Sequence, residues 1–185
     1  MHSRVAVLIE RLALAPHMEG GHFRRIHTAV APPGVRPALS AIHFLLAAGE
    51  RSNWHLVDAE EAWHFVEGEP LELLVYHADT DRLERLWLGP LGEPGSDVQP
   101  IRVVPAGAWQ TARPLGTYAL CTCLVAPAFE FAGFTLLDDD VLAAHARAGA
   151  RHGRVNRSLQ RLAGTVAGGR FSASPLSTLS ACDSA

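Results

Sequence analysis

Two short stretches decide the fold of this chain: Trp54-His55 with Glu61-Ala62-Trp63-His64 and Gly68, and then Pro105-Ala106-Gly107-Ala108-Trp109-Gln110. Five residues separate His55 from Glu61, and Gly68 follows where a tight turn would pair two strands. Side chains on neighbouring strands of a small barrel converge in its interior. The second stretch would add a group from the opposite side, but Gln110 is a weak, neutral ligand where imidazole would suit zinc, iron or nickel. We therefore predict a β-barrel site with a weakened set of metal ligands.

The bulk composition is that of one ordinary globular domain. The 185 residues are 48% hydrophobic and 19% charged, with a net charge of −3. Without a cluster of basic residues, neither nucleic acid nor an anionic membrane is expected as a partner. The apolar stretch Ala38–Ala48 is too short for a membrane span, and the N-terminus shows no signal-peptide pattern. We expect a cytoplasmic location.

The three cysteines do not indicate a disulfide framework. Cys121 and Cys123 are two apart in an apolar run, so on a strand they share one face, and the extended backbone disfavours a bond between them. Cys182 lies in a tail of small residues. Cys121 and Cys123 could form a metal-binding pair, but two buried small side chains fit the pattern better.

The chain opens with a helix and continues with strands. Val5, Leu8, Ile9 and Leu12 have helical spacing, and Pro16 is expected to end the helix. Short apolar runs between turn signals then predict an all-β sandwich or barrel. The expected strands are His22–His27, Ala38–Ala47, Ala62–Val66, Leu71–His77, Leu83–Leu88, Ile101–Val104, Thr117–Val125 and Phe131–Leu136.

The C-terminal part changes character. Asp138-Asp139-Asp140 suits the start of a short second helix, because acidic residues favour a helix N-terminus. From Arg151 the chain has a basic bias, and after Gly168-Gly169 it becomes rich in serine and alanine. We predict a barrel domain over residues 1–145 and a basic tail over residues 146–185, partly helical and otherwise disordered.

A series of motifs resembles the Cupin_5 group of the cupin superfamily, a family long catalogued as a domain of unknown function. The motifs are Pro16-His17-Met18-Glu19-Gly20-Gly21, Arg36-Pro37-Ala38-Leu39-Ser40-Ala41-Ile42, Ser52-Asn53-Trp54-His55, Glu61-Ala62-Trp63-His64-Phe65, Gly68-Glu69-Pro70-Leu71, Val103-Val104-Pro105-Ala106-Gly107-Ala108-Trp109-Gln110 and Val125-Ala126-Pro127-Ala128-Phe129-Glu130-Phe131. The resemblance implies a cupin jelly roll of the sugar-epimerase type, usually a homodimer, and no settled activity. The chain departs from the family pattern at His22 and His43, where an aromatic is common, and at Ala128, where glycine is usual. The added imidazoles suggest acid–base capacity near neutral pH.

The candidate catalytic residues are His55, Glu61, His43 and Tyr118. A histidine beside a carboxylate can abstract a proton next to a carbonyl group, with Glu61 orienting His55 or acting as the acid. The alternative is that His55 and Glu61 only brace the barrel. Strand alternation places Trp63 on the face of Glu61 and His64 on the other face, although a bulge could reverse this.

No cofactor is expected, but a divalent metal is possible, and its ligands would be His55, Glu61, Gln110 and His64. The candidate substrate-binding residues are Glu19, His22, Arg24, Trp54, Trp63, Trp109, Gln110 and Phe129. The aromatic members could equally be plain core, and Arg24 could anchor an anion or pair with a carboxylate. We expect a small-molecule enzyme of isomerase, epimerase or lyase type. The alternatives are a metal-dependent cupin oxygenase and a non-catalytic cupin that binds a metabolite.

Overall fold

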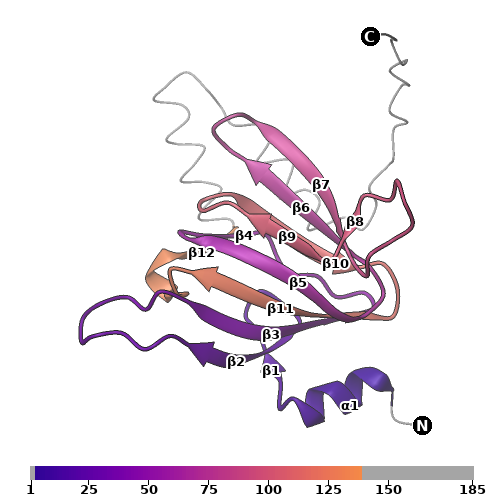
Figure 1. Ribbon diagram of the computed structural model, residues 1–185, viewed down its shortest axis with the longest axis horizontal. Coiled ribbons are helices and arrows are strands. Elements are labelled where there is room, and N and C mark those ends of the chain that lie inside the picture. Colours follow the sequence, from indigo (N-terminus) through magenta and orange to yellow (C-terminus); the bar gives the residue numbers. More distant parts are fainter. Residues whose placement is uncertain (1–2, 139–185) are drawn as a thin grey trace.

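The computed structural model describes residues 3–138, which form one short helix and two six-stranded sheets packed face to face (Figure 1). This confirms the predicted all-β arrangement with an N-terminal helix. The predicted second helix, the 145/146 boundary and the basic tail lie outside the described residues. No helix within residues 3–138 is long and apolar enough to cross a membrane.

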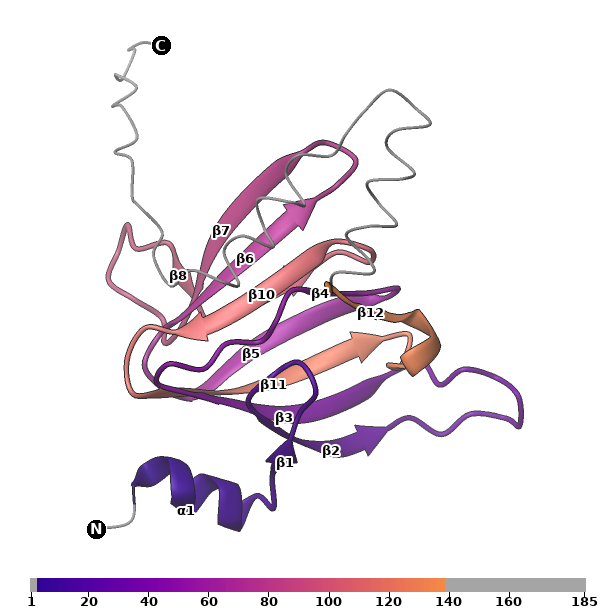
Figure 2. The ribbon, with the colours of Figure 1, turned by 180° about the vertical axis from the view of Figure 1, so that it is seen from behind.

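The first sheet has the order β1-β2-β3-β11-β5-β9, and all its neighbours pair antiparallel. Its strands are β1 (Ala15–Pro16), β2 (His22–Thr28), β3 (Ser40–Ala47), β11 (Tyr118–Ala126), β5 (Glu60–Gly68) and β9 (Ile101–Val104). The connection between β2 and β3 projects from the body of the protein in both ribbon views (Figures 1 and 2).

The second sheet has the order β12-β4-β10-β6-β7-β8 and is nearer the viewer in Figure 2. Its strands are β12 (Phe134–Leu136), β4 (His55–Val57), β10 (Trp109–Pro114), β6 (Leu71–His77), β7 (Arg82–Leu88) and β8 (Val98–Gln99). Only β7 and β8, among the described pairs, run parallel. A single 3-10 turn, η1 (Phe131–Gly133), precedes β12.

The helix α1 (Arg4–Arg11) packs on the outer face of the first sheet. Ser3 caps it by accepting a hydrogen bond from the backbone of Ala6 at 3.3 Å, and Leu8 packs against Leu45 and Leu120. The helix ends before the chain turns at Ala13, whose φ is 48°. The expectation that Pro16 ends the helix is therefore wrong, because Pro16 already belongs to β1.

The apolar core fills the space between the two sheets. Phe44, Trp63 and Cys121 project from the first sheet and meet Leu73 and Val75 of the second. The predicted strands are confirmed with ends moved by at most two residues, except that the run from Phe131 begins as η1.

Four strands, β1, β4, β8 and β10, were not predicted. Three of them have only two or three residues. The fourth, β10, is a central strand between β4 and β6, and its residues Trp109–Ala112 are all buried. It therefore lacks the period-two alternation by which a half-exposed strand is recognised.

Candidate functional site

A cavity of about 130 Å³ lies between the sheets at the end where β4, β5 and β12 meet the β2–β3 edge. Two imidazoles and two carboxyl groups line it: His17, Glu19, His55 and Glu61. The walls include the aromatic rings of Phe23, Phe129, Phe131 and Phe134. Arg25, an exposed residue of β2, also lines the cavity.

A glycine turn carries Glu19 into the cavity. The backbone N–H of His17 donates to the carbonyl of Gly21 at 3.0 Å, and that of Gly20 donates to the carbonyl of His17 at 3.0 Å. Gly20 has a φ of 107°, and a β-carbon there would collide with the backbone carbonyl of Arg51. Glycine is therefore required at this close approach, which leaves Glu19 buried with its side chain pointing inward.

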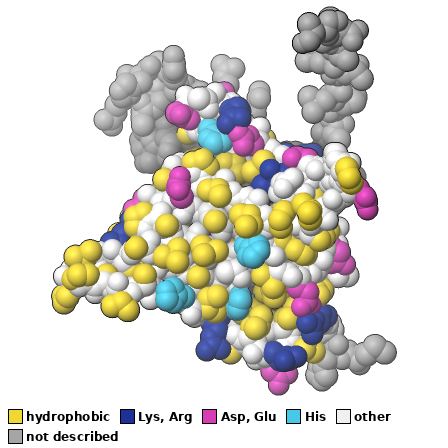
Figure 3. Space-filling view, viewed as in Figure 1, with side chains coloured by type: hydrophobic (Ala, Val, Ile, Leu, Met, Phe, Trp, Pro, Cys, Tyr) yellow, Lys and Arg dark blue, Asp and Glu magenta, His cyan; other side chains and the backbone are white. Residues whose placement is uncertain are grey.

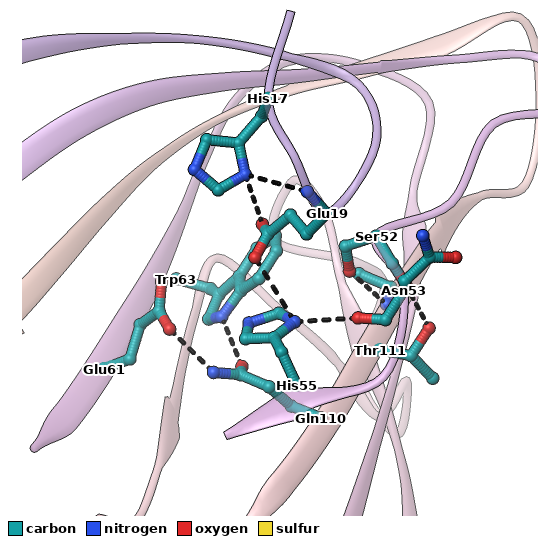
Figure 4. A network of polar contacts seen from close by, with 10 residues as sticks. His17, Glu19, Ser52, Asn53, His55, Glu61, Trp63, Gln110 and Thr111 are labelled. Carbon is teal, nitrogen blue, oxygen red and sulfur yellow. Dashed lines mark hydrogen bonds and ion pairs between the residues drawn. The ribbon is translucent and has the colours of Figure 1, made fainter. Parts of the chain in front are cut away.

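The hydrogen bonds of His55 fix which ring nitrogen carries its proton. Its Nδ1 lies 2.8 Å from the backbone carbonyl oxygen of Asn53 and 3.3 Å from Oε2 of Glu19 (Figure 4). A carbonyl can only accept, so Nδ1 is the protonated nitrogen and Nε2 keeps its lone pair. No side chain among residues 3–138 forms a hydrogen bond with Nε2. His55 therefore presents a free basic nitrogen inside the barrel.

Glu61 is held by an amide whose orientation a third residue sets. The indole N–H of Trp63 donates to Oε1 of Gln110 at 2.9 Å, and Nε2 of Gln110 donates to Oε2 of Glu61 at 2.6 Å (Figure 4). An indole can only donate, so the amide oxygen must face Trp63 and the amide nitrogen must face Glu61. Both polar atoms of Gln110 are thus used inside the protein. One carboxyl oxygen of Glu61 is fixed by this arrangement.

His17 has the opposite tautomer to His55. Its Nδ1 accepts a hydrogen bond from the backbone N–H of Glu19 at 3.3 Å, and it lies 3.7 Å from Oε1 of Glu19. The ring packs edge-on against Phe23, with 4.4 Å between the ring centroids. Nε2 is therefore the protonated nitrogen of His17, and the two imidazoles flank Glu19 from either side.

Burial moves the pKa values of all four groups toward their neutral forms. Burial raises the pKa of Glu19 to about 8 and that of Glu61 to about 7. It lowers the pKa of His17 to about 4, with a further contribution from the nearby His55, and it also lowers the pKa of His55. Burial therefore disfavours charge on both partners of the contact between His55 and Glu19. The site combines unprotonated imidazoles with carboxyl groups that retain protons.

Several predicted site residues lie outside this cavity, on the outer face of the first sheet. Arg24, His43, Thr122 and His64 form one row across β2, β3, β11 and β5. Arg24 donates to the backbone carbonyl of Leu12 at 3.3 Å. On this face, histidine side chains stand among hydrophobic ones (Figure 3). Arg24, predicted to bind substrate, His43, predicted to be catalytic, and His64, a ligand only if a metal were bound, therefore lie outside this cavity, because strand alternation turns their side chains outward.

Tyr118 and His22 also belong to the outer face. The hydroxyl of Tyr118 donates to Glu67 at 2.7 Å, and Glu67 in turn pairs with Arg4 of the helix. His22 pairs with Leu45, whose side chain packs under the helix. Tyr118, predicted to act as an acid, and His22, predicted to bind substrate, therefore also lie outside the cavity.

The four predicted aromatic residues divide into three kinds. Phe129 lines the cavity, as predicted. Trp63 is 1% exposed and holds Gln110 rather than a ligand. Trp54 and Trp109 pack with Leu74 and Tyr76 in a separate cluster and do not line the cavity. These two tryptophans are core, which corrects their assignment to substrate binding.

Two residues of the site, His17 and Arg25, are not among the residues predicted from the sequence. His17 precedes a glycine turn and follows no strand periodicity, so only its place beside Glu19 could have indicated it. Arg25 is adjacent to Arg24, and the alternation of β2 places it with Phe23 on the inner face. If the apolar Phe23 is taken to point into the core, strand alternation predicts that Arg25 points inward as well.

Most of the described part of the chain matches a known protein family. A family model described as Cupin superfamily (DUF985), the Cupin_5 family, matches residues 6–137. The chain belongs to the Cupin_5 family. No curated protein sequence matches it.

Solved structures support the family and the fold. A protein from Shewanella oneidensis is 29% identical, with a TM-score of 0.69 over 78% of this chain and 90% of that one. A hypothetical protein from Leishmania major is 24% identical, with a TM-score of 0.67 over 82% and 95% of the two chains. A mutant of oxalate decarboxylase from Bacillus subtilis is 15% identical, with a TM-score of 0.55, and the match covers 80% of this chain and 36% of that enzyme. This last likeness concerns the cupin fold alone.

The residues of this Cupin_5 cavity do not fit the metal set that the cupin motifs suggest. Both polar atoms of Gln110 are committed to Trp63 and Glu61, so neither is free to ligate a metal ion. No group of three or more His, Cys, Asp or Glu side chains within residues 3–138 is placed to hold a metal ion. The ligand set of His55, Glu61, Gln110 and His64 cannot form, because His64 points outward.

Proposed function

We propose that this Cupin_5 protein is an enzyme that transfers a proton on a small organic molecule, as isomerases, epimerases and certain lyases do. The observation that carries the proposal is the free Nε2 of a buried His55 in the same cavity as Glu61, a carboxyl group whose pKa burial raises to about 7, so that its protonated form is well populated near pH 7. Base and acid with perturbed pKa values in one pocket are the minimum equipment for acid–base catalysis.

The reaction follows from these two groups. Nε2 of His55 takes a proton from a carbon next to a carbonyl group, and the C–H electron pair moves into the new carbon–carbon double bond as the carbonyl oxygen gains charge. Glu61 donates its proton to that oxygen, which gives a neutral enol. Return of the proton to a different carbon gives an isomer, and departure of a leaving group gives an elimination product.

Gln110 and Trp63 act as positioning residues for Glu61. The amide donates to one carboxyl oxygen and so leaves the other oxygen as the one that can carry the proton. Because Trp63 fixes the amide orientation, Glu61 cannot rotate without loss of a buried hydrogen bond. Gln110, predicted from the sequence to bind substrate, makes these internal contacts instead.

The cavity favours a small substrate. Its volume of about 130 Å³ is well below the roughly 300–1,000 Å³ of sites for drug-sized ligands. Four aromatic rings and only a few polar groups line it, so the substrate needs an apolar or weakly polar body.

The test is proton exchange with solvent. The protein would be incubated in D₂O with a panel of short hydroxy acids, keto acids, ketones and aldoses, and proton NMR would follow the C–H signals next to each carbonyl. We expect exchange, isomerisation or elimination with one class of compound. The His55→Ala and Glu61→Gln variants should lose about 10²- to 10⁴-fold in rate, the usual contribution of a general base or acid.

His64→Ala is the matched control, because it removes an imidazole from the outer face and should leave the rate unchanged. Undiminished exchange in His55→Ala would contradict the proposal. Compounds that bind in the cavity and are recovered unchanged would assign the protein to the non-catalytic metabolite-binding alternative.

A further inference from the structure

We propose, on the basis of the proton-transfer function above, that the substrate is a short carboxylic acid whose carboxylate binds the guanidinium group of Arg25 at the mouth of the cavity. The assignment rests on the direction of the Arg25 side chain, on its lack of a charged partner and on its place relative to His55 and Glu61.

The strand β2 presents Arg25, and not its neighbour Arg24, to the cavity. Phe23 pairs with Phe44 and Arg25 pairs with Ile42, and the side chains of Phe23, Arg25 and Ile42 all line the cavity. A bulge follows directly, between Arg25 and His27. Bulges bend a strand and redirect side chains, and they are frequent beside functional sites.

Arg25 forms no ion pair with a carboxylate of the described residues. It is the only arginine among the residues that line the cavity, and the sequence contains no lysine. Its side chain forms no hydrogen bond or ion pair within residues 3–138. Arg36, by contrast, is already paired with Asp58 at 2.8 and 3.0 Å and lies 3.9 Å from Glu130.

The guanidinium group is held in position before any ligand binds. It lies over the ring of Phe129, 5.7 Å from the ring centroid, and Phe129 itself lines the cavity. A cation–π contact uses none of the N–H donors of a guanidinium, and its N–H edge matches both oxygens of a carboxylate. This geometry favours a planar anion over a point charge.

The opposite side of the cavity does not repel such an anion. Burial raises the pKa of Glu19 to about 8 and that of Glu61 to about 7, so the interior carries less negative charge at pH 7 than two ordinary carboxylates would. The strands β2 and β5 are three steps apart in the sheet order β2-β3-β11-β5, which corresponds to roughly 14 Å between their backbones. The side chains of Arg25, His55 and Glu61 all reach into this space from their strands, so a short acid at Arg25 can present its reacting carbon to the groups on β4 and β5.

Binding of simple acids tests the inference without knowledge of the substrate. Acetate, propionate, butyrate and benzoate would be titrated into ¹⁵N-labelled protein at pH 7, followed by two-dimensional NMR, with propionamide and benzamide as neutral counterparts. We expect the carboxylates, and not the amides, to shift the signals of Arg25, Phe129 and His55. The Arg25→Gln variant should bind carboxylates about tenfold more weakly or worse.

The matched control is Arg24→Gln, which removes the same charge from the outer face of the same strand. It should bind the acids like the wild type, and Arg25→Lys should bind them with intermediate affinity. Spectra of the free variants establish that each is folded. The inference is overturned if acids and amides bind alike, if no acid binds the wild type, or if the variants at positions 24 and 25 lose affinity equally.

The proposed function fails separately. His55→Ala should still bind carboxylates at Arg25 while losing proton exchange. Normal exchange of a neutral substrate by Arg25→Gln would overturn the carboxylate inference and leave the proton-transfer proposal intact.

Discussion

Gln110 changes what the barrel interior can do. An imidazole at this position would add a metal ligand, whereas the amide joins the indole of Trp63 to the carboxyl group of Glu61. All three side chains are buried: Trp63, Gln110 and Glu61. Water does not reach their polar atoms, so these atoms depend on each other for hydrogen bonds. The substitution converts a position suited to coordination into one that orients an acid.

Trp63→Phe tests this arrangement. The substitution keeps a ring in the core but removes the N–H donor, which leaves the amide oxygen of Gln110 buried without its partner. We expect a loss of about 1–3 kcal/mol in the free energy of unfolding, measured by urea denaturation. Trp87→Phe on β7, whose ring is only partly buried, should cost clearly less. Equal and small effects would show that the hydrogen bond is not important for stability.

The turn before β2 and the strand β2 itself bring the site together. The turn inserts Glu19 between His17 and His55, and the backbone N–H of Asn53 donates to the carbonyl of Glu19 at 2.6 Å. The next residues place Arg25 at the cavity mouth. One short segment thus supplies His17, Glu19 and Arg25, while β4 supplies His55 and β5 supplies Glu61.

Gly20→Ala tests the turn. The new methyl group would meet the carbonyl of Arg51 and would also stand at a φ of 107°. We expect a loss of about 1–3 kcal/mol in the free energy of unfolding and a loss of proton exchange as Glu19 moves. Gly34→Ala is the control, because Gly34 has a φ of 76° with open space around it. If both variants behave alike, backbone conformation alone, and not the close approach, sets the cost.

Strand periodicity predicted some of this site and missed the rest for identifiable reasons. It placed Glu61 and Trp63 inward and His64 outward, because the first residues of β5 are regular and its bulge lies further along, opposite Leu120 and Cys121. It did not choose the correct face of β2, where chemically capable residues stand on both faces. His17 lies in a turn without periodicity. The tryptophans showed that burial alone does not identify a cavity wall, since Trp54 is buried outside it.

The protein as a whole keeps four titratable groups neutral inside one small barrel. Such groups link folding to pH, because the unfolded chain exposes them to water. The predicted homodimer stays a prediction, although Val66, Ile101 and Val103 are exposed on the outer face of the first sheet.

We expect the contribution of the two carboxyl groups to stability to fall from about pH 4.5 to about pH 8, and above pH 6.5 the histidines no longer oppose this fall. The pKa values of Glu61 and Glu19 in the folded protein are about 7 and about 8, above their ordinary value of 4.5. The folded state therefore binds protons that the unfolded state has released, and this advantage disappears as the pH rises through 7 and 8. Each carboxyl group contributes up to about 1.4 kcal/mol per pH unit.

The contribution of the histidines to stability changes with pH in the opposite direction and at lower pH. His17 has a pKa of about 4 when folded against 6.5 ordinarily, so its contribution increases with pH and is complete above 6.5. Urea denaturation across this range should show the decline in the wild type and a flat profile in the Glu19→Gln, Glu61→Gln double variant. Glu67→Gln is the control, because the pKa of Glu67 is lowered to about 2 by Arg4. A double variant with an undiminished slope would contradict the pKa assignments.

The state of His55 is the most direct test of the account, because the proposed chemistry requires a neutral ring with its lone pair on Nε2. Long-range ¹H–¹⁵N correlation NMR at pH 7 distinguishes the two tautomers and the charged form, and a His55→Gln variant assigns the signals. We predict a neutral imidazole with the proton on Nδ1, as the carbonyl of Asn53 demands. A proton on Nε2, or a doubly protonated ring at this pH, would contradict the assignment of His55 as the base.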